Sequence, residues 1–218
     1  MEADFWHTRW QDNRIAFHQG RANHYLVKYL HALNVPPGGR VFVPLCGKSV
    51  DMRWLGEQGC TVTGVELSDI AVRDFFHEQG IEATHRHDGA FQIREGAGIR
   101  LLAGDFFQLN SEHLAAASAV YDRAALVALP DEMRSRYVDH LLAILPPTAP
   151  MLLLTFEYSS HEMEGPPFSV DEAQVRALFG ERRRVTRLES LERLQEEQGL
   201  AERGLTHLEE HAFLLSVI

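Results

Sequence analysis

The stretch VFVPLCGKSVDMRWLGEQGCTVTGVELS (Val41–Ser68) predicts a strand, a glycine turn, a helix and a second strand in succession. Val41–Leu45 is a short apolar run, typical of a strand buried on both faces of a parallel sheet. Gly47 then allows a sharp turn and a close approach of a ligand to the backbone. The second strand, Cys60–Val65, ends at Glu66. A carboxylate about 20 residues after such a turn typically binds ribose hydroxyls, so the stretch predicts a site for an adenosine-containing cofactor.

Strands and helices continue to alternate after this stretch. Later apolar runs predict further strands at Ile99–Ala103, Ala119–Tyr121 and Met151–Phe156, and Asp131–Leu145 is predicted to be a helix. Phe91–Arg94 and Ile99–Ala103 flank a Glu-Gly-Ala-Gly turn and are expected to form a hairpin-like pair. The last two candidates, Arg184–Leu191 and Leu208–Ile218, are expected to pair antiparallel at the sheet edge. We therefore expect an α/β fold: a doubly wound, mostly parallel, seven-stranded Rossmann-like sheet with helices on both faces and an antiparallel edge strand.

Length and composition predict one soluble globular domain. The chain has 218 residues, so we expect residues 1–218 to form a single cofactor-binding domain, with 1–35 as a helical amino-terminal cover over the site. The formal net charge of −10 disfavours a nucleic-acid groove, because phosphates require clustered Lys and Arg. No long apolar run predicts a membrane span. With only two cysteines and no signal-like amino terminus, we expect a cytoplasmic protein, and with no heptad pattern a monomer.

The residue pattern around Gly47 argues against a phosphate-binding cofactor. Gly47-Lys48-Ser49 resembles the end of a phosphate-binding loop, but that motif needs a glycine five residues earlier, where this chain has Phe42. The G-x-G-x-x-G spacing of dinucleotide sites is also absent. A cofactor with a ribose but no phosphate fits better, and S-adenosylmethionine is such a cofactor.

Several blocks distributed over nearly the whole chain share the motifs of one enzyme family. They are V-F-x-P-L-C-G-K-S-x-D-M-x-W-L at Val41–Leu55, V-x-G-V-E-x-S at Val62–Ser68, W-x-x-x-W…F-H at Trp6, Trp10, Phe17 and His18, Y-D-R-x-A-L-V-A-L-P at Tyr121–Pro130, and G-P-P-F-x-V at Gly165–Val170. In these blocks the chain resembles the bacterial thiopurine S-methyltransferases. The resemblance implies a class I S-adenosylmethionine-dependent fold and S-methylation of aromatic or heterocyclic thiols such as thiopurines. It also suggests selenium or tellurium compounds as acceptors.

The resemblance assigns cofactor residues by position, and each has a physical reason. The expected cofactor-binding residues are Trp10, Leu45, Gly47, Glu66, Asp105, Phe106 and Arg123. Glu66 would bind the ribose diol, and Leu45 would present backbone groups at the strand end. Phe106 and Asp105 would lie near the adenine. The aromatic face of Trp10 suits the sulfonium side of the cofactor, and the planar fork of Arg123 suits its carboxylate or an anionic substrate.

The acceptor side of the site is expected to be covered by two lids. One is the amino-terminal segment and the other the loop from Tyr158 to Phe168, and the expected substrate-binding residues are Phe17, His18, Arg123 and Pro166. His18 is the candidate to assist catalysis, because its ordinary pKa lies near the operating range, and Arg123 would help to stabilise a thiolate. The stretch Gln195–Leu205, where related enzymes bind the purine, aligns ambiguously, with Arg203 as one candidate.

Structural interpretations of the same residues stay open at the level of sequence. Trp6 and Trp10, one helical turn apart, also fit a core position. Asp122 and Arg123 also fit a structural ion pair. Glu66 also fits an exposed acid at the end of a strand.

Two further chemistries are considered and not adopted. His85 and His87 would share one face of a strand, but no Cys or His partner lies at a recognisable spacing, so we expect no metal. Cys46 follows a buried strand without the surroundings of a catalytic thiol, which favours packing. A non-catalytic cofactor-binding regulatory module of the same fold is the alternative to an enzyme. It predicts cofactor binding without turnover.

Overall fold

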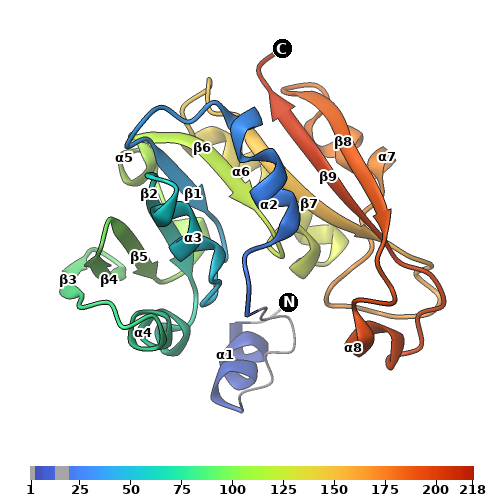
Figure 1. Cartoon of the computed structure of the whole chain (residues 1–218), viewed down its shortest axis with the longest axis horizontal. Helices are drawn as coiled ribbons and strands as arrows, with labels where there is room; N and C mark the ends of the chain where they lie inside the picture. Colours follow the sequence, from blue (N-terminus) through green and yellow to red (C-terminus); the bar gives the residue numbers. More distant parts are fainter. Residues whose placement is uncertain (1–2, 13–19) are drawn as a thin grey trace.

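The first predicted strand lies near the middle of the sheet. β1 (Arg40–Val43) is parallel to β2 (Thr61–Glu66) on one side and to β6 (Ala117–Asp122) on the other. The computed structural model describes residues 3–12 and 20–218. Within these residues the strands form one nine-stranded sheet in the order β3-β4-β5-β2-β1-β6-β7-β9-β8, which runs across the whole molecule (Figure 1).

The parallel part of the sheet and its antiparallel edge confirm the predicted fold class. β5 (Ile99–Ala103) pairs parallel with β2, and β7 (Met151–Glu157) pairs parallel with β6. β9 (Glu209–Ser216) runs antiparallel to β7, and β8 (Arg184–Glu192) runs antiparallel to β9. The predicted pairing of the last two strands is therefore confirmed.

The predicted number of strands is wrong, because an antiparallel hairpin extends the other edge. β4 (Phe91–Gly96) pairs antiparallel with β5, which confirms the predicted hairpin-like pair, and β3 (Thr84–Asp88) pairs with β4 as a further edge strand that was not predicted. Every residue of β3 is exposed, and its sequence THRHD lacks the alternation of apolar and polar residues that indicates a strand. Backbone pairing with β4, rather than burial of side chains, holds this strand in the sheet.

Helices cover both faces of the sheet because the central strands are apolar on both faces. Along β1, Val41 and Val43 pack in one hydrophobic cluster and Phe42 packs in another. The first cluster includes residues of α2 (His24–Tyr29), the 3-10 turn η1 (Leu30–Leu33), α3 (Asp51–Glu57) and α4 (Asp69–Glu78). The second includes residues of α5 (Ser111–Leu114), α6 (Asp131–Ile144) and α7 (Glu172–Phe179). The doubly wound arrangement is thus confirmed.

The carboxyl ends of the parallel strands meet at one edge, where such sheets bind ligands. α1 (Ala3–Gln11) and α8 (Gln198–Ala201) lie beyond this edge, at the bottom of Figure 1. Two non-glycine residues there adopt left-handed backbone angles: Leu45, after β1, with φ 45°, and Ala124, after β6, with φ 61°. Such conformations are disfavoured for L-residues and concentrate at functional sites.

Side chains at this edge also connect the strands to the helices. Asp122, the last residue of β6, is buried and accepts a hydrogen bond of 2.6 Å from the hydroxyl of Tyr137 on α6. Its other oxygen accepts from the backbone nitrogen of Leu126, the first residue of the 3-10 turn η3 (Leu126–Ala128). Across residues 3–12 and 20–218, none of the helices has the length and apolar content to cross a membrane.

Candidate active site

A cavity of about 540 Å³ opens at the carboxyl ends of β1, β2, β6 and β7. This volume lies within the range of about 300–1,000 Å³ that is usual for small-molecule sites. Its walls come from α1, the turns after the parallel strands, the start of β9 and the segment around α8. Eight of the residues predicted for the site line it: Trp10, Leu45, Gly47, Glu66, Asp105, Phe106, Arg123 and Pro166.

Glu66 is held in place by backbone groups at the strand ends. Its carboxylate accepts hydrogen bonds of 2.9 Å from the backbone nitrogens of Gly47 and Ser68. The residue is only 6% exposed, so the interpretation as an exposed acid is wrong. Burial raises the pKa of Glu66, and the hydrogen bonds from Ser68, Gly47 and Leu67 oppose this rise. The carboxylate is therefore preorganised at the cavity wall, as recognition of a diol requires.

The turn at Gly47 is closely covered by an aromatic ring. Gly47 has φ +53°, and a Cβ atom built on it would lie 3.2 Å from the indole of Trp10. Trp10 is buried at 6% exposure and lines the cavity, whereas Trp6, on the same wall, is half-buried. The ring of Trp10 therefore packs on the turn and also forms part of the cavity wall, and its role in cofactor binding stays a prediction.

Arg123 is oriented by a buried acid that sequence reasoning did not select. The guanidinium of Arg123 lies 3.3 Å from the carboxylate of Asp51, which is fully buried at the start of α3. The hydroxyl of Tyr121 donates to the same carboxylate at 3.0 Å, and the backbone nitrogen of Asn23 donates to it at 2.8 Å. The alternative interpretation, a structural ion pair between Asp122 and Arg123, is wrong, because the guanidinium pairs with Asp51.

The residues predicted near the adenine have additional structural roles. The carboxylate of Asp105 accepts a 2.9 Å hydrogen bond from the backbone nitrogen of Phe107 and so caps the 3-10 turn η2 (Phe106–Gln108). Phe106 is 3% exposed and packs against Tyr137, with ring centroids 4.9 Å apart. Both residues line the cavity. Because Phe106 is so deeply buried, it presents only a small apolar surface to a ligand.

The loop from Tyr158 to Phe168 and the segment around α8 form the opposite wall. The guanidinium of Arg203 donates to the carbonyl of Pro166 at 2.8 Å, so the two segments are joined directly. The hydroxyl of Tyr158 donates to the carbonyl of Pro167 at 2.6 Å, and the backbone nitrogen of Phe168 donates to the carbonyl of Val127. The ambiguous stretch Gln195–Leu205 thus contributes to this wall, through Arg203 among others.

Comparison with known proteins connects this geometry to a family. The family model described as thiopurine S-methyltransferase matches residues 1–217. The chain belongs to the thiopurine S-methyltransferase family. It is 50% identical over 215 residues to the thiopurine S-methyltransferase of Nitrosospira multiformis, covering 99% of this chain and 98% of the relative. It is 44% identical over 216 residues to that of Pseudomonas putida, covering 99% and 100%.

Solved structures show the same fold at low sequence identity. One is the 1,6-didemethyltoxoflavin-N1-methyltransferase of Burkholderia thailandensis with bound 1,6-didemethyltoxoflavin and S-adenosylhomocysteine, with a TM-score of 0.65, 18% identity and coverage of 98% of this chain and 87% of that one. Another is a SAM-dependent methyltransferase of Anabaena variabilis, with a TM-score of 0.64, 14% identity and coverage of 99% and 95%. These structures share the methyltransferase fold.

As a member of the thiopurine S-methyltransferase family, the protein is an S-adenosyl-L-methionine-dependent enzyme. The observed residues fit that cofactor. Glu66 is a fixed, buried hydrogen-bond acceptor at the cavity wall, next to the turn at Gly47. Lys48, which a phosphate site would direct at its ligand, instead pairs at 2.6 Å with Glu78 of α4. This pairing agrees with a cofactor that carries no phosphate.

The other chemistries that the sequence raised find no support in this geometry. Among the described residues, no three His, Cys, Asp or Glu side chains are placed to hold a metal ion. His85 and His87 lie on one face of the exposed strand β3, with ring centroids 5.4 Å apart. Cys46 is buried against Gly64, and burial raises the pKa of its thiol, which disfavours the thiolate.

Two of the predicted residues have no described position. Phe17 and His18 lie outside the described residues 3–12 and 20–218, so their predicted roles in substrate binding and catalysis stay predictions. Other residues of the site were missed by sequence reasoning. Asp51 belongs to a family block but was not selected, because its role depends on contacts with distant segments. Glu210 gives no sequence signal beyond a charge within an apolar strand.

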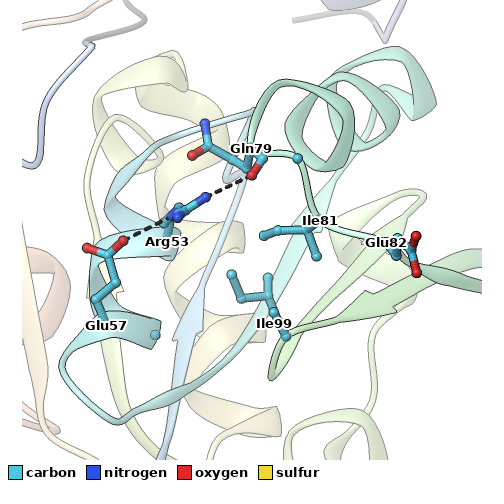
Figure 2. Close-up of a pocket in the computed structure, with 9 residues that line it drawn as sticks. Arg53, Glu57, Gln79, Ile81, Glu82 and Ile99 are labelled. Atoms are coloured by element: carbon cyan, nitrogen blue, oxygen red, sulfur yellow. Dashed lines mark hydrogen bonds and ion pairs between the residues drawn. The ribbon is translucent and has the colours of Figure 1, made fainter.

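A second hollow lies at the other end of the strands, near the amino end of β5. Figure 2 shows it between the last turns of α3 and α4 and the start of β5, with Ile81 and Ile99 at its base. Arg53 there donates hydrogen bonds to Glu57 and to the carbonyl of Gln79. This hollow is open to solvent and far from the carboxyl ends of the strands. It is not part of the active-site cavity.

Proposed function

We propose that this enzyme transfers the methyl group of S-adenosylmethionine to the sulfur of an aromatic or heterocyclic thiol, such as a thiopurine. The observation that carries the proposal is that Glu66 and Arg123 line one cavity. The opposite wall of this cavity is formed by the loop from Tyr158 to Phe168 and the segment around α8. Glu66 lies at the end of β2, and Arg123 lies just after β6. The family match over nearly the whole chain supports sulfur as the methyl acceptor.

The residues on the cofactor side of the cavity are placed and charged to bind S-adenosylmethionine. Glu66 would accept hydrogen bonds from the ribose, and the ring of Trp10, which covers the turn at Gly47, would face the cationic sulfur. Arg123, held by Asp51, would bind the methionyl carboxylate or an anionic acceptor through its planar fork. When bound, the cofactor supplies an electrophilic methyl group on a cationic sulfur.

The acceptor half of the cavity combines apolar walls with a few charges. Leu154 and Phe156 of β7 and the loop residue Pro166 provide apolar surface, while Arg203 lies on the rim. Such a wall excludes water and aligns the two sulfur atoms, which favours a reaction that brings together a positive and a negative centre. Selenium and tellurium compounds are included as possible acceptors, since their nucleophilic centres resemble sulfur in chemistry.

The proposal includes the domain organisation, the amino-terminal cover of the site, and the oligomeric state and location of the protein. We expect residues 1–218 to act as one domain, with residues 1–35 covering the cavity through Trp6 and Trp10. We further expect a cytoplasmic monomer without nucleic-acid partners, because the net charge is −10 and sequence patterns for association are lacking. Gel filtration with light scattering measures the oligomeric state directly.

The function is tested by transfer of a labelled methyl group across a panel of acceptors. The panel contains thiopurines, thiophenols, selenite and tellurite, each incubated with the intact enzyme and labelled S-adenosylmethionine. We expect labelled thioethers from the aromatic thiols. Binding of the cofactor by calorimetry together with no transfer to any member of the panel would instead favour the regulatory-module alternative.

A further inference from the structure

Glu210 is a buried acid on the acceptor side of the cavity with no role in the function proposed above. β9 is antiparallel to β7, so its first residues lie at the same edge as the carboxyl ends of the parallel strands. Glu210 pairs across the sheet with Phe156, and both residues line the cavity. Glu210 is only 4% exposed. A carboxylate is thus placed where an acceptor molecule would lie.

The groups around Glu210 hold it without neutralising it fully. The Nε of Arg193 lies 3.4 Å from its carboxylate, and the side chain of Asn23 makes a hydrogen bond with it. Arg193 also contacts Glu196, so its charge is shared between two acids. The other charged or titratable groups that face Glu210 are Arg123, Glu197, Tyr25 and Tyr121.

We propose that Glu210 is the catalytic proton acceptor for the thiol of the methyl acceptor. This inference rests on the proposed function, since it requires a thiol in the cavity. It concerns acceptors that are still protonated at neutral pH, because an already ionised thiol needs no base. Arg123, which lines the same cavity, provides the positive surroundings that stabilise the thiolate as it forms.

The chemical properties of Glu210 suit this task. Burial raises its pKa to about 7, although Arg193 and Arg123 act in the opposite direction. A base is most effective when its pKa lies close to the pH at which it operates. An ordinary surface glutamate, with a pKa near 4.3, would be a much weaker base toward a thiol. Buried acids with shifted pKa values in a cavity are frequent at active sites.

The proposed step is balanced in atoms and charge. The thiol proton passes to a carboxylate oxygen of Glu210, and the sulfur forms a bond to the methyl carbon. The bond between that carbon and the sulfonium breaks, and its electron pair stays on the departing sulfur. After the thioether leaves, the proton on Glu210 passes to solvent, which restores the carboxylate.

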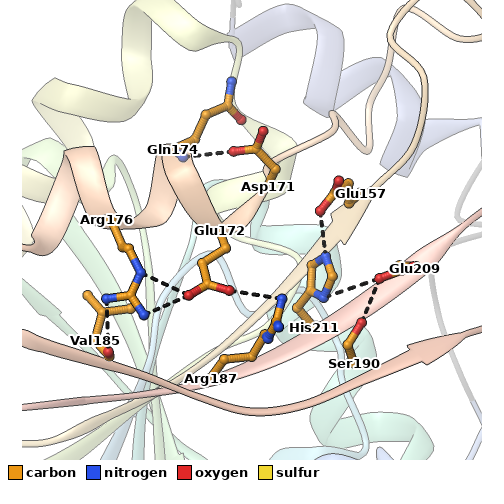
Figure 3. A network of polar contacts seen from close by, with 10 residues as sticks. All are labelled: Glu157, Asp171, Glu172, Gln174, Arg176, Val185, Arg187, Ser190, Glu209 and His211. Atoms are coloured by element: carbon orange, nitrogen blue, oxygen red, sulfur yellow. Dashed lines mark hydrogen bonds and ion pairs between the residues drawn. The ribbon is translucent and has the colours of Figure 1, made fainter.

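Glu209 provides a matched control, because neighbouring residues of a strand point to opposite faces. Glu209 takes part in a polar network with Ser190 and His211 (Figure 3), whereas Glu210 lines the cavity. The hydroxyl of Ser190 donates to Glu209 at 2.7 Å, and His211 lies 2.9 Å from Glu157. The change from Glu to Gln at 209 therefore has the same chemistry as at 210 but no access to the acceptor.

The test compares two thiols in the same enzyme preparation. One is an electron-poor heterocyclic thiol that is already ionised at pH 7.5, and the other a benzylic thiol that is not. We expect Glu210→Gln to lower kcat/KM for the benzylic thiol by about 10²–10⁴-fold, the usual contribution of a general base, and to leave the ionised thiol nearly unaffected. Glu209→Gln should leave both values unchanged. The ratio of the two values within one variant is independent of the fraction of enzyme that is folded.

The pH profile provides a second readout that a structural role would not change. With the benzylic thiol, wild-type activity should rise to a plateau above pH of about 7, where Glu210 is ionised. In Glu210→Gln the rate should keep rising toward the pKa of the thiol itself. Glu210→Asp, which keeps a displaced carboxylate, should have an intermediate ratio and retain the plateau.

The alternative outcomes are distinct. If Glu210→Gln changes kcat/KM by the same factor for both thiols, or changes neither value, the role of Glu210 is overturned and the methyltransferase function stays intact. If the wild-type enzyme methylates neither thiol, the proposed function itself fails, and the role of Glu210 fails with it.

Discussion

The backbone nitrogen of Gly47 donates a 2.9 Å hydrogen bond to the carboxylate of Glu66, which joins the turn after β1 to the end of β2. This contact holds two parts of the cavity wall together. The turn positions the backbone that a ligand approaches, and the carboxylate points to the cavity that this turn borders. A change at either residue is therefore expected to affect both cofactor affinity and the local fold.

Replacement of Glu66 by Ala should weaken binding of S-adenosylmethionine by on the order of 1–3 kcal/mol, because charge-assisted hydrogen bonds to the ribose are lost. Isothermal titration calorimetry measures the change. The exposed Glu112 on α5 serves as the control, and Glu112→Ala should bind as the wild type does. Unchanged affinity in Glu66→Ala would remove Glu66 from the site.

Gly47→Ala should destabilise the protein more than Gly59→Ala. Both glycines have positive φ, +53° and +84° respectively, so both substitutions carry backbone strain of about 1–2 kcal/mol. Only at Gly47 would the new Cβ also meet a side chain, the indole of Trp10 at 3.2 Å; at Gly59 no described atom lies within 4 Å. Urea unfolding of the two variants gives the comparison. Equal destabilisation would show that Trp10 does not press on the turn.

Asp51 and Arg123 should act as a coupled pair in cofactor binding. Asp51→Asn removes the charge that orients the guanidinium, and we expect a loss of affinity for S-adenosylhomocysteine. In an Arg123→Ala background the same change should have little further effect, which corresponds to a coupling energy of about 1 kcal/mol or more. Asp139→Asn, which alters an exposed ion pair with Arg182, is the control. Additive effects of the two changes would contradict the coupling.

The pH dependence of stability should differ between the wild type and Glu210→Gln. In the folded protein the pKa of Glu210 is raised from 4.5 to about 7, so the folded state retains a proton that the unfolded state releases. The contribution of this group to the free energy of unfolding therefore falls as the pH rises from 4.5 to 7. Glutamine cannot ionise, so the variant should gain about 2 kcal/mol relative to the wild type between pH 5 and pH 8.

The measurement is urea unfolding of both proteins at the two pH values. Because only the difference between them is used, the titration of other groups cancels. A constant difference, or one that changes in the opposite direction, would contradict a raised pKa at Glu210.

The sequence predicted the parallel part of the fold because its strands are apolar on both faces. Val41–Leu45 and Met151–Phe156 are continuous apolar runs. β1 begins one residue before the first run and ends two residues before its end, and β7 begins with the second run and ends one residue after it. The strand β3 has no such signal, since all five of its residues are exposed and polar. Its place in the sheet depends on pairing with β4, a contact that no periodicity in THRHD indicates.

The same difference separates the site residues that were predicted from those that were missed. Glu66 and Gly47 are recognisable because they lie at a characteristic spacing within one strand–turn–helix–strand unit. Asp51 and Glu210 depend on contacts between segments far apart in the chain, such as Asn23 with Asp51. Spacing along a sequence carries no information about such contacts, so Asp51 and Glu210 emerged only from the folded structure.

Methyl transfer to sulfur by this enzyme is best tested with a matched pair of acceptors. A heterocyclic thiol and its oxygen analogue are each incubated with the enzyme and S-adenosylmethionine labelled in the methyl group, and the products are identified by mass spectrometry. We expect label on the sulfur of the thiol, none on the oxygen analogue, and greatly reduced transfer in Glu66→Ala. Cofactor-saturated, folded enzyme that leaves the thiol unmethylated would contradict this expectation.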